Sequence, residues 1–138
     1  MKTILLLSIL ILHGCANPAP APAIAPAEPE ALSRTEFTNR VENYFEYEPL
    51  KSGKASQVRI HLTDLSDGSP VEQAEVTLTV KPHSASAPIA QTVGRIGKVT
   101  GIYVADLTIP KPGAYDIDFH IKNAKLDEHL PLSNFKVE

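Results

Sequence analysis

The sequence predicts an all-β domain, folded as a β-sandwich of about seven strands, and three observations support this prediction. Runs of alternating apolar and polar residues, rich in β-branched side chains, recur along the chain, which is typical of half-buried strands. Turn-forming Gly, Pro, Asp and Asn separate these runs at intervals of about 8–12 residues, as in β-sandwiches. The segment 34–138 has the length of about a hundred residues that is usual for an immunoglobulin-like domain.

The clearest strands lie on either side of the turn at Asp67-Gly68. In the first run, Val58, Ile60 and Leu62 point to one face and the polar residues between them to the other. In the second run, the same pattern places Val76, Leu78 and Val80 on one face. A pair of strands with one apolar face is not stable alone in water, so other strands must cover that face.

The same alternation predicts the remaining strands, at 37–47, 89–95, 102–109, 115–121 and 130–137. Tyr115, Ile117 and Phe119 form the inward face of one of them. Gly113 and Tyr115 also resemble a tyrosine corner, in which a Tyr at the start of the penultimate strand bonds back to an upstream backbone group. A plain core tyrosine fits the sequence equally well.

The first 14 residues have the pattern of a secretory signal peptide. Lys2 is followed by an apolar run at 4–12 that is too short to span a membrane. Leu12 and Gly14 before Cys15 resemble the lipobox of bacterial lipoproteins, although His13 departs from it. The resemblance implies that Cys15 carries a diacylglyceryl group and an acyl chain such as palmitate. Ala16 then favours the outer membrane, facing the periplasm. The alternative is an ordinary signal peptide with an incidental Cys.

A linker rich in Pro and Ala follows the predicted lipid site. We assign the lipidated Cys and this linker to residues 15–33 and the folded domain to residues 34–138. Frequent proline removes backbone donors and prevents helix or sheet from propagating, so we expect a disordered, extended tether. The tether would hold the domain away from the membrane.

Composition excludes several classes of protein. The formal charge is −3 and no basic patch emerges, which argues against a nucleic-acid partner. The single Cys excludes an intramolecular disulfide and a zinc site built from several thiolates. The chain contains no GxSxG, HExxH or phosphate-binding glycine motif, so we do not expect an enzyme.

Two stretches resemble a known family. The motif EYEPL at 46–50 and the motif HLTDLSDGSPV at 61–71 resemble the N-terminal domain of periplasmic adaptor proteins of heavy-metal efflux pumps of the resistance-nodulation-division type. GIYVADLTIPKPGAYDIDF at 101–119 resembles the second half of that domain and of YtkA-like periplasmic domains. The resemblance implies an immunoglobulin-like fold and a role beside metal efflux. Adaptors continue into a hairpin, a lipoyl-like unit and a β-barrel, so we expect a detached accessory domain.

Four residues are candidate metal ligands: His61, Asp118, His120 and His129. Imidazole and carboxylate groups suit zinc or copper(II). Asp118 and His120 are two residues apart on one predicted strand and therefore share a face. His61 lies on the predicted strand that contains Val58–Leu62, and His120 on the predicted strand at 115–121. If these two strands are neighbours, the two histidines approach each other and bind an ion weakly. The alternative is that all four are ordinary solvated surface residues.

The sequence thus supports two functions. The first is an envelope-anchored accessory lipoprotein that assists a heavy-metal efflux system through protein contacts or weak capture of zinc or copper. The second is a general immunoglobulin-like binding module of the envelope, for protein or glycan, without metal.

Overall fold

The computed structural model describes residue 27 and residues 30–138. The predicted signal peptide, Cys15 and the linker up to residue 29, apart from residue 27, therefore lie outside the described residues. The described chain holds no helix that is long and apolar enough to cross a membrane. It forms eight strands: β1 (Leu32–Phe37), β2 (Val41–Tyr47), β3 (Ala55–Asp64), β4 (Glu75–Pro82), β5 (Ala90–Ile96), β6 (Ile102–Thr108), β7 (Gly113–Lys122) and β8 (Asp127–Val137).

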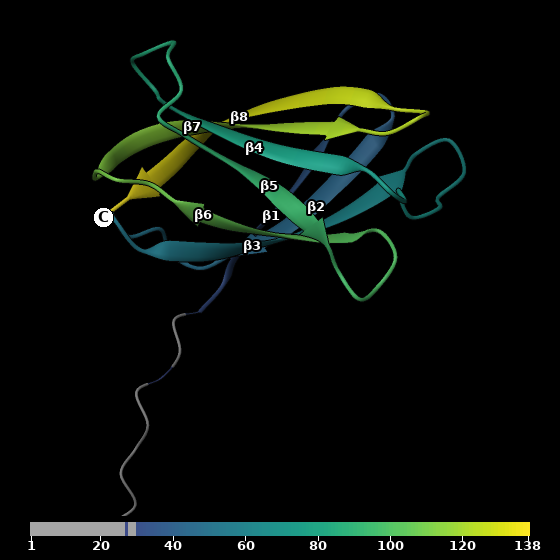
Figure 1. Ribbon diagram of the computed structural model, residues 1–138, viewed down its shortest axis with the longest axis horizontal. Helices are drawn as coiled ribbons and strands as arrows, with labels where there is room; N and C mark the ends of the chain where they lie inside the picture. Colours follow the sequence, from purple (N-terminus) through teal and green to yellow (C-terminus); the bar gives the residue numbers. More distant parts are fainter. Residues whose placement is uncertain (1–26, 28–29) are drawn as a thin grey trace, which may run out of the picture.

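The strands form one nearly closed antiparallel sheet in the order β1-β2-β3-β6-β5-β4-β7-β8. Figure 1 shows β4, β7 and β8 on one side of the molecule and β2, β3 and β6 on the other. β5 joins the two sides, because its first part pairs with β4 and its last two residues, Arg95 and Ile96, pair with β6. The prediction of an all-β fold is confirmed.

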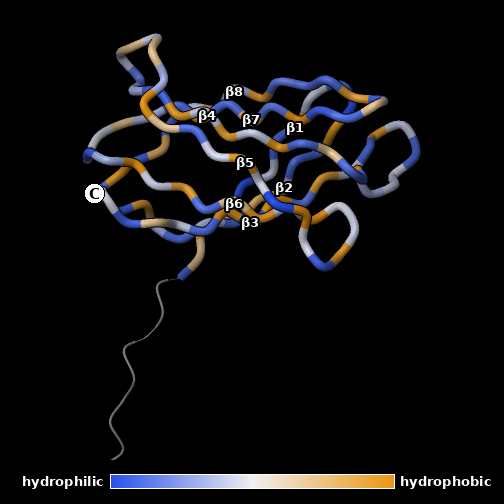
Figure 2. The backbone as a smooth tube through the Cα atoms, in the orientation of Figure 1, coloured by the Kyte–Doolittle hydropathy of each residue, from blue (hydrophilic) through white to orange (hydrophobic). Residues whose placement is uncertain are grey.

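The core lies between the two sides of the sheet, where apolar positions alternate with polar ones along most of the strands (Figure 2). Phe45 of β2 and Phe119 of β7 meet there, with ring centroids 4.8 Å apart. All the inward positions predicted above are buried: Val58, Ile60, Leu62, Val76, Leu78, Val80, Tyr115, Ile117 and Phe119. Contact between the two sides therefore comes from the residues that the alternation selects.

One predicted strand is wrong in its extent. The segment 37–47 is divided between β1 and β2, and residues 38–40 turn the chain. The Thr38 hydroxyl oxygen accepts hydrogen bonds from the backbone N–H groups of Arg40 and Val41, at 3.1 and 3.0 Å. Thr side chains often form such hydrogen bonds with nearby backbone N–H groups, which then do not take part in the hydrogen bonds between strands. It raises the number of strands from about seven to eight.

β3 and β4 lie on either side of the turn at Asp67-Gly68, but they do not pair with each other. β3 pairs with β2 and β6, whereas β4 pairs with β5 and β7. The connection between β3 and β4 crosses from one side of the sheet to the other. The buried Tyr103 hydroxyl holds it in place by donating to the Val71 carbonyl, at 2.8 Å, and accepting from the Ala74 N–H, at 3.0 Å.

Side chains bring the two ends of the sheet together. Arg34 of β1 donates a hydrogen bond to the Ser133 carbonyl of β8, at 2.9 Å, and its guanidinium lies 4.9 Å from the centre of the Phe135 ring. On β7, the Tyr115 hydroxyl donates to the backbone carbonyl of Lys111, four residues upstream, at 2.9 Å. The Arg34 contacts thus join β8 to β1, and the Tyr115 bond ties the start of β7 to the turn that precedes it.

Candidate metal site

The candidate site lies on the outward face of β7 and β8. Asp118, His120 and Lys122 alternate with buried residues on β7, so their side chains point away from the core. The antiparallel register places His129 of β8 directly opposite His120, and Asp127 opposite Lys122. Directly opposed residues on one face of a sheet are close enough for their side chains to interact.

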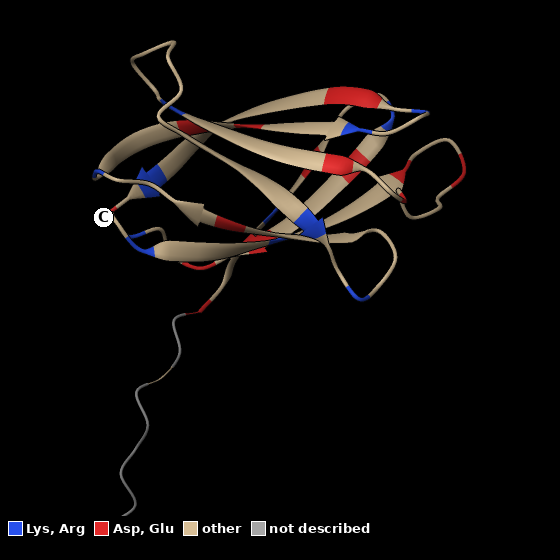
Figure 3. Cartoon of the chain, in the orientation of Figure 1, with Lys and Arg blue, Asp and Glu red and all other residues tan. Residues whose placement is uncertain are grey.

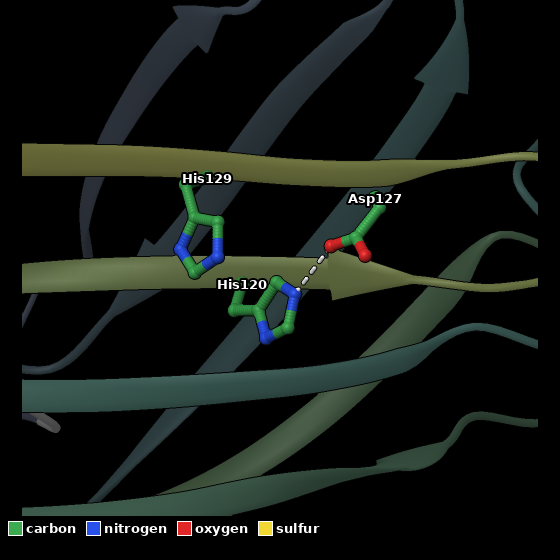
Figure 4. A group of neighbouring side chains, drawn as sticks. All are labelled: His120, Asp127 and His129. Atoms are coloured by element: carbon green, nitrogen blue, oxygen red, sulfur yellow. Dashed lines mark hydrogen bonds and ion pairs between the residues drawn. The ribbon is translucent and has the colours of Figure 1, made fainter.

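His120, Asp127 and His129 form a cluster (Figure 4). Each offers one ligand atom, and these three atoms lie within 4.8 Å of one another. The Nε2 atom of His120 is 2.7 Å from Oδ1 of Asp127, and the rings of His120 and His129 stack with centroids 4.0 Å apart. Two imidazoles and a carboxylate are a ligand set that suits zinc and copper(II).

Asp118 contacts the cluster from the opposite side. One of its carboxylate oxygens, Oδ2, is 2.8 Å from Nδ1 of His129. Its other oxygen, Oδ1, is buried and has no hydrogen-bond partner among the described residues. Asp118 therefore binds a cluster histidine and does not itself lie among the three grouped ligand atoms.

The cluster must rearrange to hold an ion. Zinc binds imidazole nitrogen at about 2.0–2.1 Å, along a lone pair in the plane of the ring. The two rings are nearly parallel, at 6°, so their lone pairs run side by side and cannot meet at one ion. One ring must turn, and the contact between His120 and Asp127 must open. These costs point to a weak, exchangeable site.

Acidic and basic residues lie side by side where β7 turns into β8 (Figure 3). These neighbouring charges both favour and oppose the binding of a metal ion by Asp127. The hydrogen bond with His120, and next the one with Lys122, hold the pKa of Asp127 below its ordinary value of 3.8, so the carboxylate stays ionised as a ligand. The ammonium of Lys122 is 3.1 Å from Oδ2 of Asp127 and competes with a metal ion for it.

A third histidine–aspartate pair lies on the same side of the sheet. His83, in the loop after β4, is 2.9 Å from Asp116, and this hydrogen bond lowers the pKa of the Asp116 carboxyl. Asp116 points outward from β7 as Asp118 does, two residues along the strand. His83 lies outside the three-residue cluster and so offers a comparison for it.

His61 lies elsewhere. In the strand order, β6, β5 and β4 separate β3 from β7, so the expected approach of His61 to His120 is wrong. Alternation predicts which face a histidine occupies but not which strands are neighbours. His61 instead packs edge-on against Tyr44, with ring centroids 5.3 Å apart, and its Nε2 is 4.0 Å from Oε2 of Glu46.

Sequence reasoning missed Asp127. The sequence pattern predicts a turn at 123–127 and a last strand that begins at residue 130. The turn is tighter, because the side-chain oxygen of Asn123 accepts hydrogen bonds from the N–H groups of Lys125 and Leu126, both at 2.8 Å. The strand therefore starts at Asp127 and brings this carboxylate beside His120. Asn123 is the signal in the sequence that could have indicated this tight turn, because Asn side chains often bond to backbone groups two residues further on.

Comparison of the chain with protein-family models, with curated proteins and with solved structures finds no match. The candidate site therefore depends on the geometry of the described residues.

Proposed function

We propose that this chain is an envelope-anchored accessory lipoprotein that captures a divalent transition-metal ion weakly on the outward face of β7 and β8, and so assists a heavy-metal efflux system. The observation that carries the metal role is the grouping of His120, Asp127 and His129 within 4.8 Å. Three protein ligands leave at least one coordination position open to water or to a receiving protein. An ion held in this way can leave again.

The choice of metal follows from the ligands. Imidazole nitrogen is preferred by zinc and copper(II), whereas calcium and magnesium need several oxygen ligands. The cluster offers only one carboxylate, so hard cations gain little from it. Copper(II) binds such sites more tightly than zinc does.

The cellular setting rests on the sequence. The signal peptide, Cys15 and Ala16 support a lipid anchor in the outer membrane on the periplasmic side, and the motifs at 46–50 and 61–71 support a place beside an efflux pump. An immunoglobulin-like sandwich is the finer form of the fold that we propose. Two features support it: the two sides of the sheet that face each other across the core, and the bond from Tyr115 to Lys111.

The anchor is tested by replacing Cys15 with Ala. We expect the wild-type protein to fractionate with membranes and to incorporate labelled palmitate, and the variant to lose the label. A wild-type protein that is released as a soluble species with a free thiol would exclude a lipoprotein.

The metal role is tested by isothermal titration of zinc and copper(II) into the purified full chain without a polyhistidine tag. We expect binding that is lost in His120→Ala and His129→Ala and kept in the matched control His83→Ala. Affinity should fall as the pH is lowered, because protons compete with the ion for the imidazole nitrogens. No heat beyond dilution, or equal binding in all three variants, would exclude this function.

A second function, protein binding without metal, is favoured by one observation. Val93, Ile96 and Val99 of β5 and the following hairpin are each more than half exposed, at 58, 63 and 61 %. Large exposed apolar side chains, three of them between residues 93 and 99, favour a contact surface. Pull-down of a pump component by the wild type but not by Val93→Ser with Ile96→Ser, at equal metal content, would support this function over metal capture.

A further inference from the structure

We propose that Asp118 is a positioning residue for the metal site: its carboxylate holds His129 with the proton on Nδ1 and so leaves Nε2 free to bind the ion. This inference rests on the proposed function, because it assigns a role toward the same ion. The sequence predicts that Asp118 is itself a metal ligand, whereas this inference assigns it the role of orienting His129. Asp127 is instead the carboxylate that coordinates the ion directly.

The geometry of His129 carries the assignment. Nδ1 lies 2.8 Å from Oδ2 of Asp118, which is the distance of a charge-assisted hydrogen bond. A carboxylate can only accept, so the nitrogen at this position must carry the proton. In a neutral imidazole the other nitrogen, Nε2, then has a free lone pair. Figure 4 shows the two nitrogens of the His129 ring on opposite sides, one of them toward Asp127.

His120 is held in a different way, which separates the two aspartates. Its contact to a carboxylate is made by Nε2, with Oδ1 of Asp127, at 2.7 Å. Asp127 is therefore grouped with the ligand atoms, whereas Asp118 lies at the far nitrogen of a ligand. Carboxylates that accept from the second nitrogen of a metal-binding histidine fix its tautomer and make it a stronger ligand.

The fold supplies the precision that such a role needs. Asp118 and His129 lie on neighbouring strands, with Asp118 opposite Pro131, two residues beyond His129 on the same face. Both strands are held in the ladder, so the carboxylate stays within reach of the ring without a loop movement. Sites built on strands hold their ligands more closely than sites on loops.

The test measures the tautomer and the metal affinity separately, in the full chain without a polyhistidine tag. The variant is Asp118→Ala, which removes the acceptor; Asp118→Asn keeps a carbonyl acceptor at the same place. The matched control is Asp116→Ala, which removes the same charge from the same face of β7 but frees His83 instead. Nitrogen-15 spectra of the imidazoles report the tautomer at high pH, and zinc titration reports the affinity.

We expect wild-type His129 to carry its proton on Nδ1, and this preference to be lost in Asp118→Ala and kept in Asp118→Asn. Zinc affinity should fall by about 10- to 100-fold in Asp118→Ala, the usual effect of losing such a partner, and by much less in Asp116→Ala. Urea unfolding of each variant should remain a single cooperative transition, which excludes a general loss of structure.

Three results would overturn the inference. Either an Nε2–H tautomer in the wild type or an unchanged tautomer in Asp118→Ala refutes the positioning role, even if zinc binds. Equal loss of zinc affinity in Asp118→Ala and Asp116→Ala would mean that the loss of one negative charge explains the whole effect, and this result also refutes the positioning role. A wild type that shows the Nδ1–H tautomer but takes up no zinc refutes the proposed function, and the two failures are thereby distinguished.

Discussion

Phe119 offers the sharpest test of how the fold holds the site. Its side chain is only 1 % exposed, and its ring centroid is 4.8 Å from that of Phe45 on the other side of the core. Replacing a buried Phe with Ala costs about 3–5 kcal/mol, because apolar contacts are lost and a cavity remains. About 0.5–1.5 kcal/mol of this belongs to the aromatic pair itself. We therefore expect Phe119→Ala to lower the free energy of unfolding by about 3–5 kcal/mol.

Urea unfolding measures this change, and the midpoint should fall while the slope stays constant. At the melting temperature, a loss of about 3 kcal/mol corresponds to about 12–24 °C for a domain of this size. The matched control is His120→Ala, one residue along β7, whose side chain points outward. It should cost under about 1 kcal/mol. A cost below about 1 kcal/mol for Phe119→Ala, or an equal cost for the two variants, would refute the register, because a slip of one residue exchanges the faces.

Three further predictions follow from single side chains. Asn43 is fully buried and both polar atoms of its amide lack a partner among the described residues, so Asn43→Leu should raise the free energy of unfolding by about 1–3 kcal/mol; a destabilised variant would indicate a bound water or an unseen partner. Lys122→Met should tighten zinc binding about two- to fivefold in calorimetry, because it removes a cation that competes for Asp127; unchanged affinity would contradict this. Hydrogen bonds lower the carboxyl pKa of Asp116 and Asp127 in the folded state. The two carboxylates therefore stabilise the fold fully above their ordinary pKa of 3.8, and this stabilisation is lost as the pH falls through the lowered pKa values. The urea midpoint should therefore drop below about pH 4, and less so in Asp116→Asn, whereas an equal acid dependence in that variant would contradict the assignment.

The sequence predicted which residues are buried much better than which strands are neighbours. Burial follows from alternation, and alternation is local, so the inward faces that contain Ile60, Leu78 and Phe119 could be assigned from a few residues each. Pairing depends on contacts between distant segments. The runs in β3 and β4 have the same pattern whether or not they pair, and in the fold they lie on opposite sides of the core.

The same distinction explains the outcome for the site. His120 could be chosen because its residue type and its outward face are visible in the sequence, and His129 because of its residue type next to the predicted last strand. Their position directly opposite each other depends on the register of β7 and β8, which the length of the turn sets. The predicted start of the last strand, residue 130, is three residues later than the observed start, so Asp127 fell outside the strand and was not considered as a ligand. His61 was chosen by the same rule as His120, but its strand lies on the other side.

The place of the cluster in the fold also bears on how an ion would come and go. The ladder fixes the backbones of His120 and His129 opposite each other, so binding requires only side-chain rotation and no backbone movement. Asp127 and His129 are exposed, so no loop among residues 30–138 covers them. The geometry of the site therefore selects little between metals, and binding should follow the general order of affinity of divalent metal ions, in which copper(II) binds more tightly than zinc. On the proposed function, such a site serves exchange better than storage. Its open coordination position lets a receiving protein add its own ligand to the ion before His120 and His129 release it.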